Sequence, residues 1–214
     1  LPVSVSFEFF PPNTPVGSDK LKTVVQELAA AQPEFFSVTY GAGGSTREKT
    51  LATVSAIAAM GHEAAPHLSC VGSTREGISE ILATYRTQNI HRLVALRGDL
   101  PSGTATAGDF RYASELVSFI RETQGKDWFI EVAAYPEYHP QARRAQLDLA
   151  AFKAKIDAGA SSAITQYFYN ADAYFHFVEQ VEALGVNVAI VPGIMPILNF
   201  AQLARFSDAC GAEI

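Results

Sequence analysis

Residues 91–101, which read HRLVALRGDLP, decide the fold. The apolar run at 93–96 has the length of a buried strand and ends directly in Arg97, Gly98 and Asp99. A cation and a carboxylate at the end of a buried strand are poorly explained by stability alone. In sheets and barrels of alternating strands and helices, the chemistry takes place at the carboxyl ends of the strands. The stretch therefore predicts an α/β protein with its functional site at that end.

Other apolar runs in the chain also end in a side chain that can bind or react. These side chains are Glu8, Thr39, Tyr40, His67, Tyr135 and Gln166. The carboxyl ends of parallel strands meet at one edge of a sheet or barrel, so we expect these residues to line one shared site.

Hydrophobic periodicity predicts seven strand–helix units, at a spacing of about 25 to 35 residues that suits a strand, a crossover and a helix. The strands are expected at 3–9, 35–40, 64–70, within 91–101, and at 128–134, 162–168 and 186–191. The first four helices are expected to begin at the caps Ser18, Ser45, Ser73 and Asp109. The last three are expected over 141–158, where Gly159 ends the helix, and over 171–184 and 200–209.

Two architectures fit this alternation, a doubly wound open sheet and a closed (β/α)8 barrel. Ser4, Ser6, Ser37 and Thr39 occupy the second face of the first two strands. Both faces of an open sheet are covered by apolar helices, so small polar residues on one face favour a barrel interior. We therefore predict an α/β (β/α)8 barrel, a single domain over residues 1–214, whose last strand is absent from the chain.

The composition suits one sizeable hydrophobic core, with 48% hydrophobic and 18% charged residues among 214. A net charge of −6, without a run of Lys or Arg, argues against a nucleic-acid partner. Cys70 and Cys210 lie far apart beside apolar runs, which favours two buried reduced thiols over a disulfide or a metal site. Two reduced thiols suit a cytoplasmic protein. No apolar run is long enough to span a membrane.

Glu8 is the first candidate for acid–base chemistry. Its neighbours Phe7, Phe9 and Phe10 are aromatic. A carboxylate that loses solvation among aromatic rings has a raised pKa, which suits a general acid. The alternative is a glutamate that pairs with an arginine inside the barrel.

Arg97 and Asp99 stand two residues apart and form either an internal ion pair or part of a ligand site. Gly98 and Pro101 favour the ligand site, because they allow close backbone approach and a fixed turn beside a planar ligand. His67 has no second ligand at metal-binding spacing. We therefore expect His67 to hydrogen-bond to a ligand or to the core, and we expect no metal site.

Two further signals leave their alternatives open. Glycines at 41, 43 and 44 before a helix suggest a phosphate-binding loop, although they match neither the dinucleotide fingerprint nor the Walker pattern. Phe200 is either a stacking surface or, as its spacing favours, the start of the core face of a helix.

Six segments, taken together and in this order, resemble bacterial 5,10-methylenetetrahydrofolate reductases. They are 6–12 (SFEFFPP), 37–42 (SVTYGA), 64–68 (AAPHL), 94–101 (VALRGDLP), 133–137 (AAYPE) with 139–140 (HP), and 157–160 (DAGA) with 164–166 (ITQ). The six segments extend over nearly the whole chain, and no single one of them would be specific alone.

The resemblance implies an eight-stranded barrel that binds FAD at the carboxyl ends of its strands. It implies that NADH or NADPH reduces the flavin and leaves, and that methylenetetrahydrofolate then enters and is reduced to 5-methyltetrahydrofolate, the methyl donor for methionine synthesis. It also suggests a homo-oligomer. Family members continue through an eighth strand, so the alternative is a FAD- or nucleotide-binding barrel without turnover. A metal-assisted aldolase-type barrel would need clustered ligands that the sequence does not offer.

The resemblance also implies roles for single residues. Glu8 is the implied acid that helps to open the five-membered ring of the folate, and Asp99 the carboxylate near the flavin pyrimidine and the pterin. Gln166 is implied to contact the pterin, and Phe200 to stack on the substrate or the nicotinamide. The implied FAD contacts are Thr39, His67, Arg97, Asp99, Tyr135, His139, Asp148 and Lys155, and Ala160 is an implied packing position.

Overall fold

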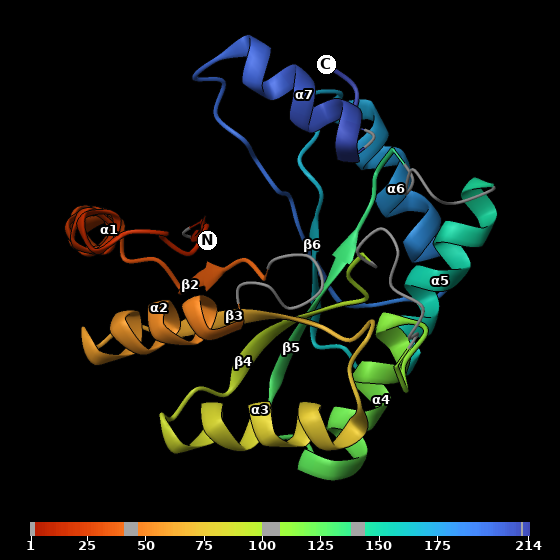
Figure 1. The fold of residues 1–214 in the computed structure, drawn as a ribbon. Coiled ribbons are helices and arrows are strands. Elements are labelled where there is room, and N and C mark those ends of the chain that lie inside the picture. Colours follow the sequence, from red (N-terminus) through yellow and green to blue (C-terminus); the bar gives the residue numbers. More distant parts are fainter. Residues whose placement is uncertain (1–2, 41–46, 100–107, 138–143, 211) are drawn as a thin grey trace. The chain divides into compact units, whose positions relative to one another are not determined.

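The computed structural model describes residues 3–40, 47–99, 108–137, 144–210 and 212–214. The chain forms two compact units, Leu1–Phe129 and Ile130–Ile214, and the boundary falls inside a strand. Each unit is an alternation of parallel strands and helices (Figure 1). The prediction that residues 1–214 make one domain stays a prediction.

The first unit contains four parallel strands, hydrogen-bonded in the order β1-β2-β3-β4. The strands are β1 (Ser6–Phe9), β2 (Phe35–Val38), β3 (Ala64–Ser69) and β4 (Arg92–Leu96). The helices are α1 (Pro15–Leu28), the short 3-10 helix η1 (Ala29–Ala31), α2 (Arg47–Ala59), α3 (Arg75–Thr87) and α4 (Ala113–Gln124).

The second unit contains three parallel strands in the order β5-β6-β7. They are β5 (Phe129–Ala134), β6 (Ser162–Thr165) and β7 (Ala189–Val191). The helices are α5 (Ala145–Asp157), α6 (Ala171–Ala183) and α7 (Phe200–Cys210). Helices α5 and α6 lie side by side (Figure 1), and the rings of Phe152 and Phe177 meet edge to face with their centroids 5.3 Å apart.

The strand order decides between the two predicted architectures. A doubly wound sheet reverses its strand order at a switch point, whereas the strands of a (β/α)8 barrel follow chain order. Neither unit contains a reversal. The chain therefore has the α/β fold of a (β/α)8 barrel, and the described residues hold seven of the eight strand–helix units. The predicted fold class is confirmed.

The core of the first unit follows from its apolar pattern. Strands β2 and β3 are buried along their whole length, as expected of parallel strands covered by helices. Helix α3, which lies beside β4 (Figure 1), buries Ile78, Ile81, Leu82 and Tyr85. Their spacing of three and four residues forms one helical stripe, so this helix is fixed by the face it presents to the sheet.

The predicted helix starts were less accurate than the helices themselves. Helix α1 begins at Pro15, whose fixed backbone suits the first helical position, and the Thr14 side chain accepts a hydrogen bond from Gly17 N at 3.1 Å. Ser18 therefore lies inside the helix and does not cap it. Helix α3 is likewise capped by Thr74 and not by Ser73. Ser45 lies outside the described residues.

Asp109 does not cap the helix that follows it. Its carboxylate accepts a hydrogen bond of 2.9 Å from Arg75 N, at the start of α3. Helix α4 instead begins at Ala113, where the Glu115 carboxylate accepts hydrogen bonds from Arg111 N and Tyr112 N. A cap from a distant loop satisfies the first helical N–H groups as well as a local one does, and local sequence cannot reveal it.

The amino-terminal ends of the strands carry an arginine clamp, made of Arg92, Glu34, Phe35 and Phe129. The Arg92 guanidinium lies 4.4 Å from the ring centroid of Phe35 and 4.1 Å from that of Phe129. Arg92 Nη2 also lies 2.7 Å from Glu34 Oε1, and Ser4 donates a hydrogen bond to the same carboxylate. The Arg92 guanidinium, placed between two aromatic rings and beside a carboxylate, stabilises this end of the unit. This end lies opposite the carboxyl ends of the strands.

Candidate active site

The carboxyl ends of β1 to β4 bring several predicted site residues to one edge of the first unit. Glu8 lies near the end of β1, His67 lies in β3, and Thr39 follows β2. Backbone hydrogen bonds continue beyond the strands, from Thr39 N to Phe9 O at 2.9 Å and from Val71 N to Arg97 O at 2.8 Å. The backbone that carries these side chains is therefore fixed by the sheet, which positions them more exactly than free loops would.

Glu8 and His67 form the direct contact in this group. His67 Nε2 lies 3.4 Å from Glu8 Oε2. The His67 side chain is only 10% exposed, whereas that of Glu8 is 53% exposed. The carboxylate therefore faces the open side of the sheet edge, where a substrate can reach it, and the imidazole stands behind it.

The expectation of a raised pKa for Glu8 is wrong. Partial burial raises this pKa, but the donor nitrogen and the charge of the nearby His67 imidazole lower it, and the net pKa of Glu8 lies below its usual range. The aromatic neighbours do not enclose the carboxylate, because alternate residues of a strand point to opposite faces. Phe7 and Phe9 stack on Phe36, with ring centroids 6.0 and 5.8 Å apart, on the face away from Glu8.

Gly98 is required by the backbone that follows β4. Its φ is +78°, and a Cβ atom at this position would lie 2.7 Å from the Ser69 Cβ atom. The close approach that the structure shows at Gly98 is to Ser69 of β3, and the predicted approach to a planar ligand stays a prediction. Arg97 and Asp99 flank this turn with exposed side chains, as a ligand-binding pair requires.

The second unit carries the remaining site residues that the structure describes. Tyr135, half-buried, follows β5, and Gln166 follows β6. Gln166 Oε1 accepts a hydrogen bond of 3.0 Å from Tyr167 N. This bond fixes the orientation of the amide and directs its NH2 group away from Tyr167 N. Ala160, for which the resemblance implies a packing role, is buried. His139 lies outside the described residues.

Helix α5 carries both Asp148 and Lys155, and the charge of Asp148 acts on the Lys155 ammonium group. Lys155 Nζ donates a hydrogen bond of 2.5 Å to Ala133 O, near the end of β5. Burial lowers the pKa of Lys155 to about 8, and the charge of Asp148 offsets part of this effect. The ammonium group is thus held at the carboxyl end of a strand and changes its charge close to neutral pH.

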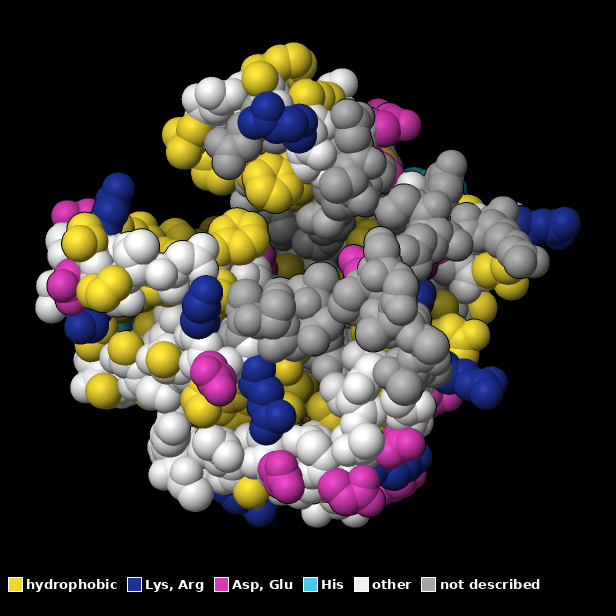
Figure 2. Space-filling model, in the orientation of Figure 1, with side chains coloured by type: hydrophobic (Ala, Val, Ile, Leu, Met, Phe, Trp, Pro, Cys, Tyr) yellow, Lys and Arg dark blue, Asp and Glu magenta, His cyan; other side chains and the backbone are white. Residues whose placement is uncertain are grey.

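The interpretation of Phe200 as a core residue is wrong. Its side chain is 68% exposed at the start of α7, and hydrophobic side chains gather over this helix at the top of Figure 2. The segment before α7 also exposes Ile194, Ile197 and Leu198, by 82%, 60% and 95%. Phe200 and this segment form an exposed apolar surface, consistent with the stacking role.

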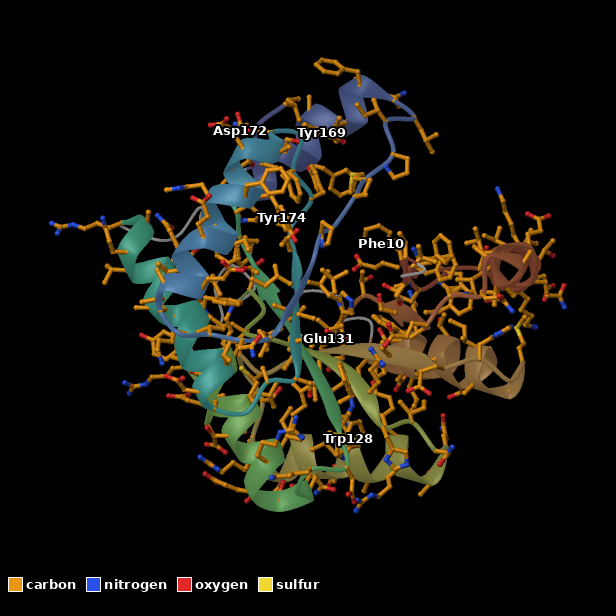
Figure 3. The ribbon with its side chains drawn as sticks, turned by 180° about the vertical axis from the view of Figure 1, so that it is seen from behind. Phe10, Trp128, Glu131, Tyr169, Asp172 and Tyr174 are labelled. Carbon is orange, nitrogen blue, oxygen red and sulfur yellow. The ribbon has the colours of Figure 1, made fainter. Side chains whose placement is uncertain are left out.

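Sequence reasoning missed the contacts that fix this segment. Gly193 N donates to Thr165 Oγ1 at 2.9 Å, and a Cβ atom on Gly193 would overlap Thr165 O. Tyr169, which precedes α6 (Figure 3), donates from its hydroxyl to Met195 O at 2.9 Å. A glycine directly after Pro192 was the available signal for the first contact. No local pattern indicates the second.

Two kinds of feature are absent from the described part of the chain. None of its helices is long and apolar enough to cross a membrane. It contains no cluster of three or more His, Cys, Asp or Glu side chains arranged to hold a metal ion. The Cys70 thiol is buried and free, and burial raises its pKa to about 12.

The whole chain matches a known family. The model of the family described as methylenetetrahydrofolate reductase covers residues 2–214. The chain belongs to the methylenetetrahydrofolate reductase family. This membership confirms the resemblance carried by the six segments, and it makes the chain an oxidoreductase of folate reduction in one-carbon metabolism.

Individual relatives agree with the family match. The 5,10-methylenetetrahydrofolate reductase of Salmonella typhimurium is 42% identical over 99% of this chain and 71% of the relative. The enzyme of Pectobacterium carotovorum is 45% identical over 99% of this chain and 70% of the relative. Methylenetetrahydrofolate reductase (NADH) 1 of Arabidopsis thaliana is 40% identical over 98% of this chain and 38% of the relative.

Solved structures support the fold. A protein from Clostridium thermocellum, described as binding two copies of 5-methyl-5,6,7,8-tetrahydrofolic acid, has a TM-score of 0.65 at 15% identity, over 99% of this chain and 72% of the other. The 3-dehydroquinate dehydratase of Geobacillus kaustophilus has a TM-score of 0.56 at 12% identity, over 90% and 73%. At such identities the likeness extends to the fold alone.

Proposed function

We propose that the protein reduces 5,10-methylenetetrahydrofolate to 5-methyltetrahydrofolate with NADH or NADPH, through a bound FAD and in a ping-pong sequence. The observation that carries the proposal is the 42–45% identity to bacterial reductases over 99% of the chain. The Clostridium neighbour, which has the same fold and is described as binding 5-methyl-5,6,7,8-tetrahydrofolic acid, adds support for a folate substrate. We further propose a cytoplasmic homo-oligomer, which the resemblance to the bacterial enzymes suggests.

The described residues fit a flavin dinucleotide. The exposed guanidinium of Arg97 suits a phosphate or a ring carbonyl, and the strand-end hydroxyl of Thr39 adds a donor and an acceptor. Lys155, with a pKa of about 8, is a cation that a phosphate group would hold in its charged form. We assign the FAD contacts to these residues together with His67, Asp99, Tyr135, His139 and Asp148.

Bound FAD would supply the hydride carrier between nicotinamide and folate. The chain's own residues prepare the folate. Glu8 gives a proton to a nitrogen of the five-membered ring, the carbon–nitrogen bond breaks with its electron pair going to that nitrogen, and the other nitrogen forms the iminium double bond. The half-exposed position of the Glu8 carboxylate suits this contact with substrate.

Asp99, Gln166 and Phe200 have supporting roles in this proposal. The Asp99 carboxylate, near the flavin pyrimidine, disfavours additional negative charge on the reduced ring and so tunes hydride transfer. Gln166 turns its amide NH2 group to the pterin, because its Oε1 atom is already engaged by Tyr167 N. The exposed ring of Phe200 stacks on the substrate or the nicotinamide.

A second candidate is a FAD- or nucleotide-binding barrel without turnover. The chain aligns with 71% of the length of the Salmonella relative. The two candidates agree on flavin binding and differ on folate reduction.

A series of visible absorption spectra separates the reductase from the barrel without turnover. The visible absorption of the purified protein with added FAD is recorded before and after anaerobic NADH, and then after methylenetetrahydrofolate. A bound flavin band that bleaches with NADH and returns with the folate supports the reductase. A band that bleaches and does not return supports the second candidate. An absence of bound flavin would contradict both.

A further inference from the structure

The imidazole behind Glu8 has an unusual environment. His67 Nε2 is buried, and within the described part of the chain no hydrogen bond reaches it. Glu8 Oε2, at 3.4 Å, lies just beyond the usual range of about 2.7–3.2 Å for an N–H···O hydrogen bond. A shift of a few tenths of an ångström would bring His67 Nε2 within hydrogen-bond distance of the half-exposed Glu8 carboxylate.

The side chains beside Glu8 and His67 in the neighbouring strands carry no charge near neutral pH. In the strand register, Ser37 of β2 lies beside Glu8 and Val94 of β4 lies beside His67, and neither side chain ionises near neutral pH. Arg97 and Asp99 follow β4 with exposed side chains, where solvent screens them. Among the described residues, His67 is the one side chain whose proximity lowers the pKa of Glu8.

This arrangement raises a question about the proposed acid. With its pKa below the usual range, the Glu8 carboxyl is ionised at neutral pH and holds no proton to give. Histidine is the side chain that ordinarily gains and loses a proton between about pH 5 and 8. The buried Nε2 atom is therefore placed where a proton can be stored next to the carboxylate.

We propose that His67 is a positioning residue for Glu8, which holds a proton at Nε2 and transfers it to the Glu8 carboxylate as the substrate binds. This inference rests on the proposed function. It adds a proton source to the acid and gives His67 a role in addition to its proposed flavin contact.

The step balances without any further reactant. The Nε2–H bond of His67 breaks and an O–H bond forms on Glu8 Oε2, which leaves a neutral imidazole and a neutral carboxylic acid. The acid then protonates the ring nitrogen of the folate and becomes a carboxylate again. Water returns the proton to His67 after the product leaves, so one proton is taken from solvent in each turnover.

The test compares His67→Gln with a matched variant, His62→Gln, in the FAD-loaded protein. Gln keeps a donor near the Nε2 position but does not hold a titrating proton. His62 lies before β3, at the opposite end of the same strand, where its ring packs against Phe36. Stopped-flow absorbance follows two half-reactions, reduction of the flavin by NADH and its reoxidation by methylenetetrahydrofolate.

We expect His67→Gln to slow reoxidation by the folate about 10- to 100-fold at pH 7.5. This is at or below the lower end of the roughly 10²- to 10⁴-fold contribution of general acid catalysis, because Glu8 itself remains. In this variant, the rate of flavin reoxidation by the folate should rise as the pH falls, because protons from solvent then replace the proton that His67 would hold. Reduction by NADH, measured on the FAD-bound fraction, should slow less than reoxidation by the folate. His62→Gln should leave both half-reactions at the wild-type rates. The double variant Glu8→Gln/His67→Gln should be no slower than Glu8→Gln, since the two side chains act as a unit.

A second measurement does not depend on turnover. Carbon-13 NMR of labelled glutamate, with Glu8→Gln to assign the signal, gives the pKa of Glu8 directly. We expect this pKa to rise in His67→Gln and to stay unchanged in His62→Gln.

The outcomes separate the failure of this inference from that of the proposed function. If the wild type binds FAD but never reduces the folate, the proposed function fails, and the NMR result still decides whether the pair is coupled. If the wild type is active and His67→Gln slows both half-reactions equally or loses FAD, His67 is only a flavin contact. An unchanged pKa of Glu8 in His67→Gln would also overturn the inference.

Discussion

At the scale of single residues, Glu8 offers the most selective test of the proposed chemistry. Glu8→Gln keeps the size of the side chain but removes the group that gives a proton to the folate. We expect folate reduction to slow by about 10²- to 10⁴-fold, the usual range for loss of a general acid. Flavin reduction by NADH should be spared, because it does not use this proton. Stopped-flow measurement of the two half-reactions checks the split.

Glu63→Gln is the matched control for this variant. Glu63 is exposed and directly precedes β3, at the end of the strands opposite Glu8. Its variant should keep both half-reactions. Equal slowing of both half-reactions in Glu8→Gln would remove Glu8 from the acid role and assign it to flavin binding.

Gly98 tests how closely the turn after β4 is packed. Gly98→Ala places a methyl group 2.7 Å from Ser69 Cβ, at a φ of +78° that Ala rarely adopts. We expect a loss of about 1–3 kcal/mol in the free energy of unfolding, and weaker FAD binding because Arg97 and Asp99 move with the turn. Urea unfolding and FAD titration measure the two effects.

Gly125→Ala separates the two causes of this loss. Gly125 has a similar φ of +71°, but nothing lies within 4 Å of the position that its Cβ would take. It should lose only the part due to backbone strain, and FAD affinity should not change. Equal losses in the two variants would mean that the contact with Ser69 is unimportant.

At the scale of secondary-structure elements, the arginine clamp holds the amino-terminal ends of strands together. Arg92→Met keeps much of the apolar stem but removes the charge that lies between Phe35 and Phe129 and pairs with Glu34. We expect a loss of about 1–3 kcal/mol in the free energy of unfolding, because the guanidinium is largely buried. Thermal and urea unfolding measure it.

Arg86→Met is the corresponding change in an exposed pair. Arg86 and Asp127 lie 3.2 Å apart, with side chains 45% and 71% exposed. Because surface pairs are screened by solvent, we expect a loss below about 0.5 kcal/mol. A similar loss in both variants would show that burial between the rings adds nothing to the clamp.

Helix α5 gives the proposed FAD site a pH dependence through Lys155. Its pKa of about 8 means that the ammonium is charged below this pH and neutral above it. If it binds a phosphate group of FAD, the affinity should be highest near pH 7 and should fall about tenfold towards pH 9.5, which corresponds to ~1.4 kcal/mol. Fluorescence titration of FAD across this range measures the fall.

Two variants of α5 check this assignment. Lys155→Met should bind FAD weakly at every pH, whereas Lys153→Met, which removes an exposed pair with Asp157, should behave as the wild type. In the FAD-free protein, stability should rise from pH 8 towards about 10.4, because only the unfolded state keeps this lysine protonated there. A pH-independent affinity in the wild type would exclude Lys155 from phosphate binding.

At the scale of the whole molecule, the sequence predicted the elements well because their signals are local. Seven apolar runs with helical stripes between them placed the strands and helices within a few residues of their observed ends. The polar residues at strand ends, such as Glu8 and His67, were predicted to share one edge, and parallel pairing brings them there.

The features that the sequence did not predict depend on residues far apart in the chain. The pKa of Glu8 is lowered by His67, two strands away, although the adjacent aromatic rings predicted a rise. Asp109 caps α3, which precedes it in the chain, and Tyr169 holds Met195. Periodicity and capping rules describe neighbours in sequence, so contacts between distant segments need the folded structure.

The proposed cofactor also predicts a property of the molecule as a whole. A ligand that binds only the folded state stabilises it by RT ln(1 + [L]/Kd), about 2.7 kcal/mol at 100 times the Kd. FAD at that excess should therefore raise the unfolding temperature by several degrees in a thermal scan, and Glu8→Gln should keep this shift because Glu8 acts on the folate. NADH alone, without flavin, should shift it far less. A protein that folds cooperatively but shows no shift with FAD would contradict the flavin assignment, whatever its family.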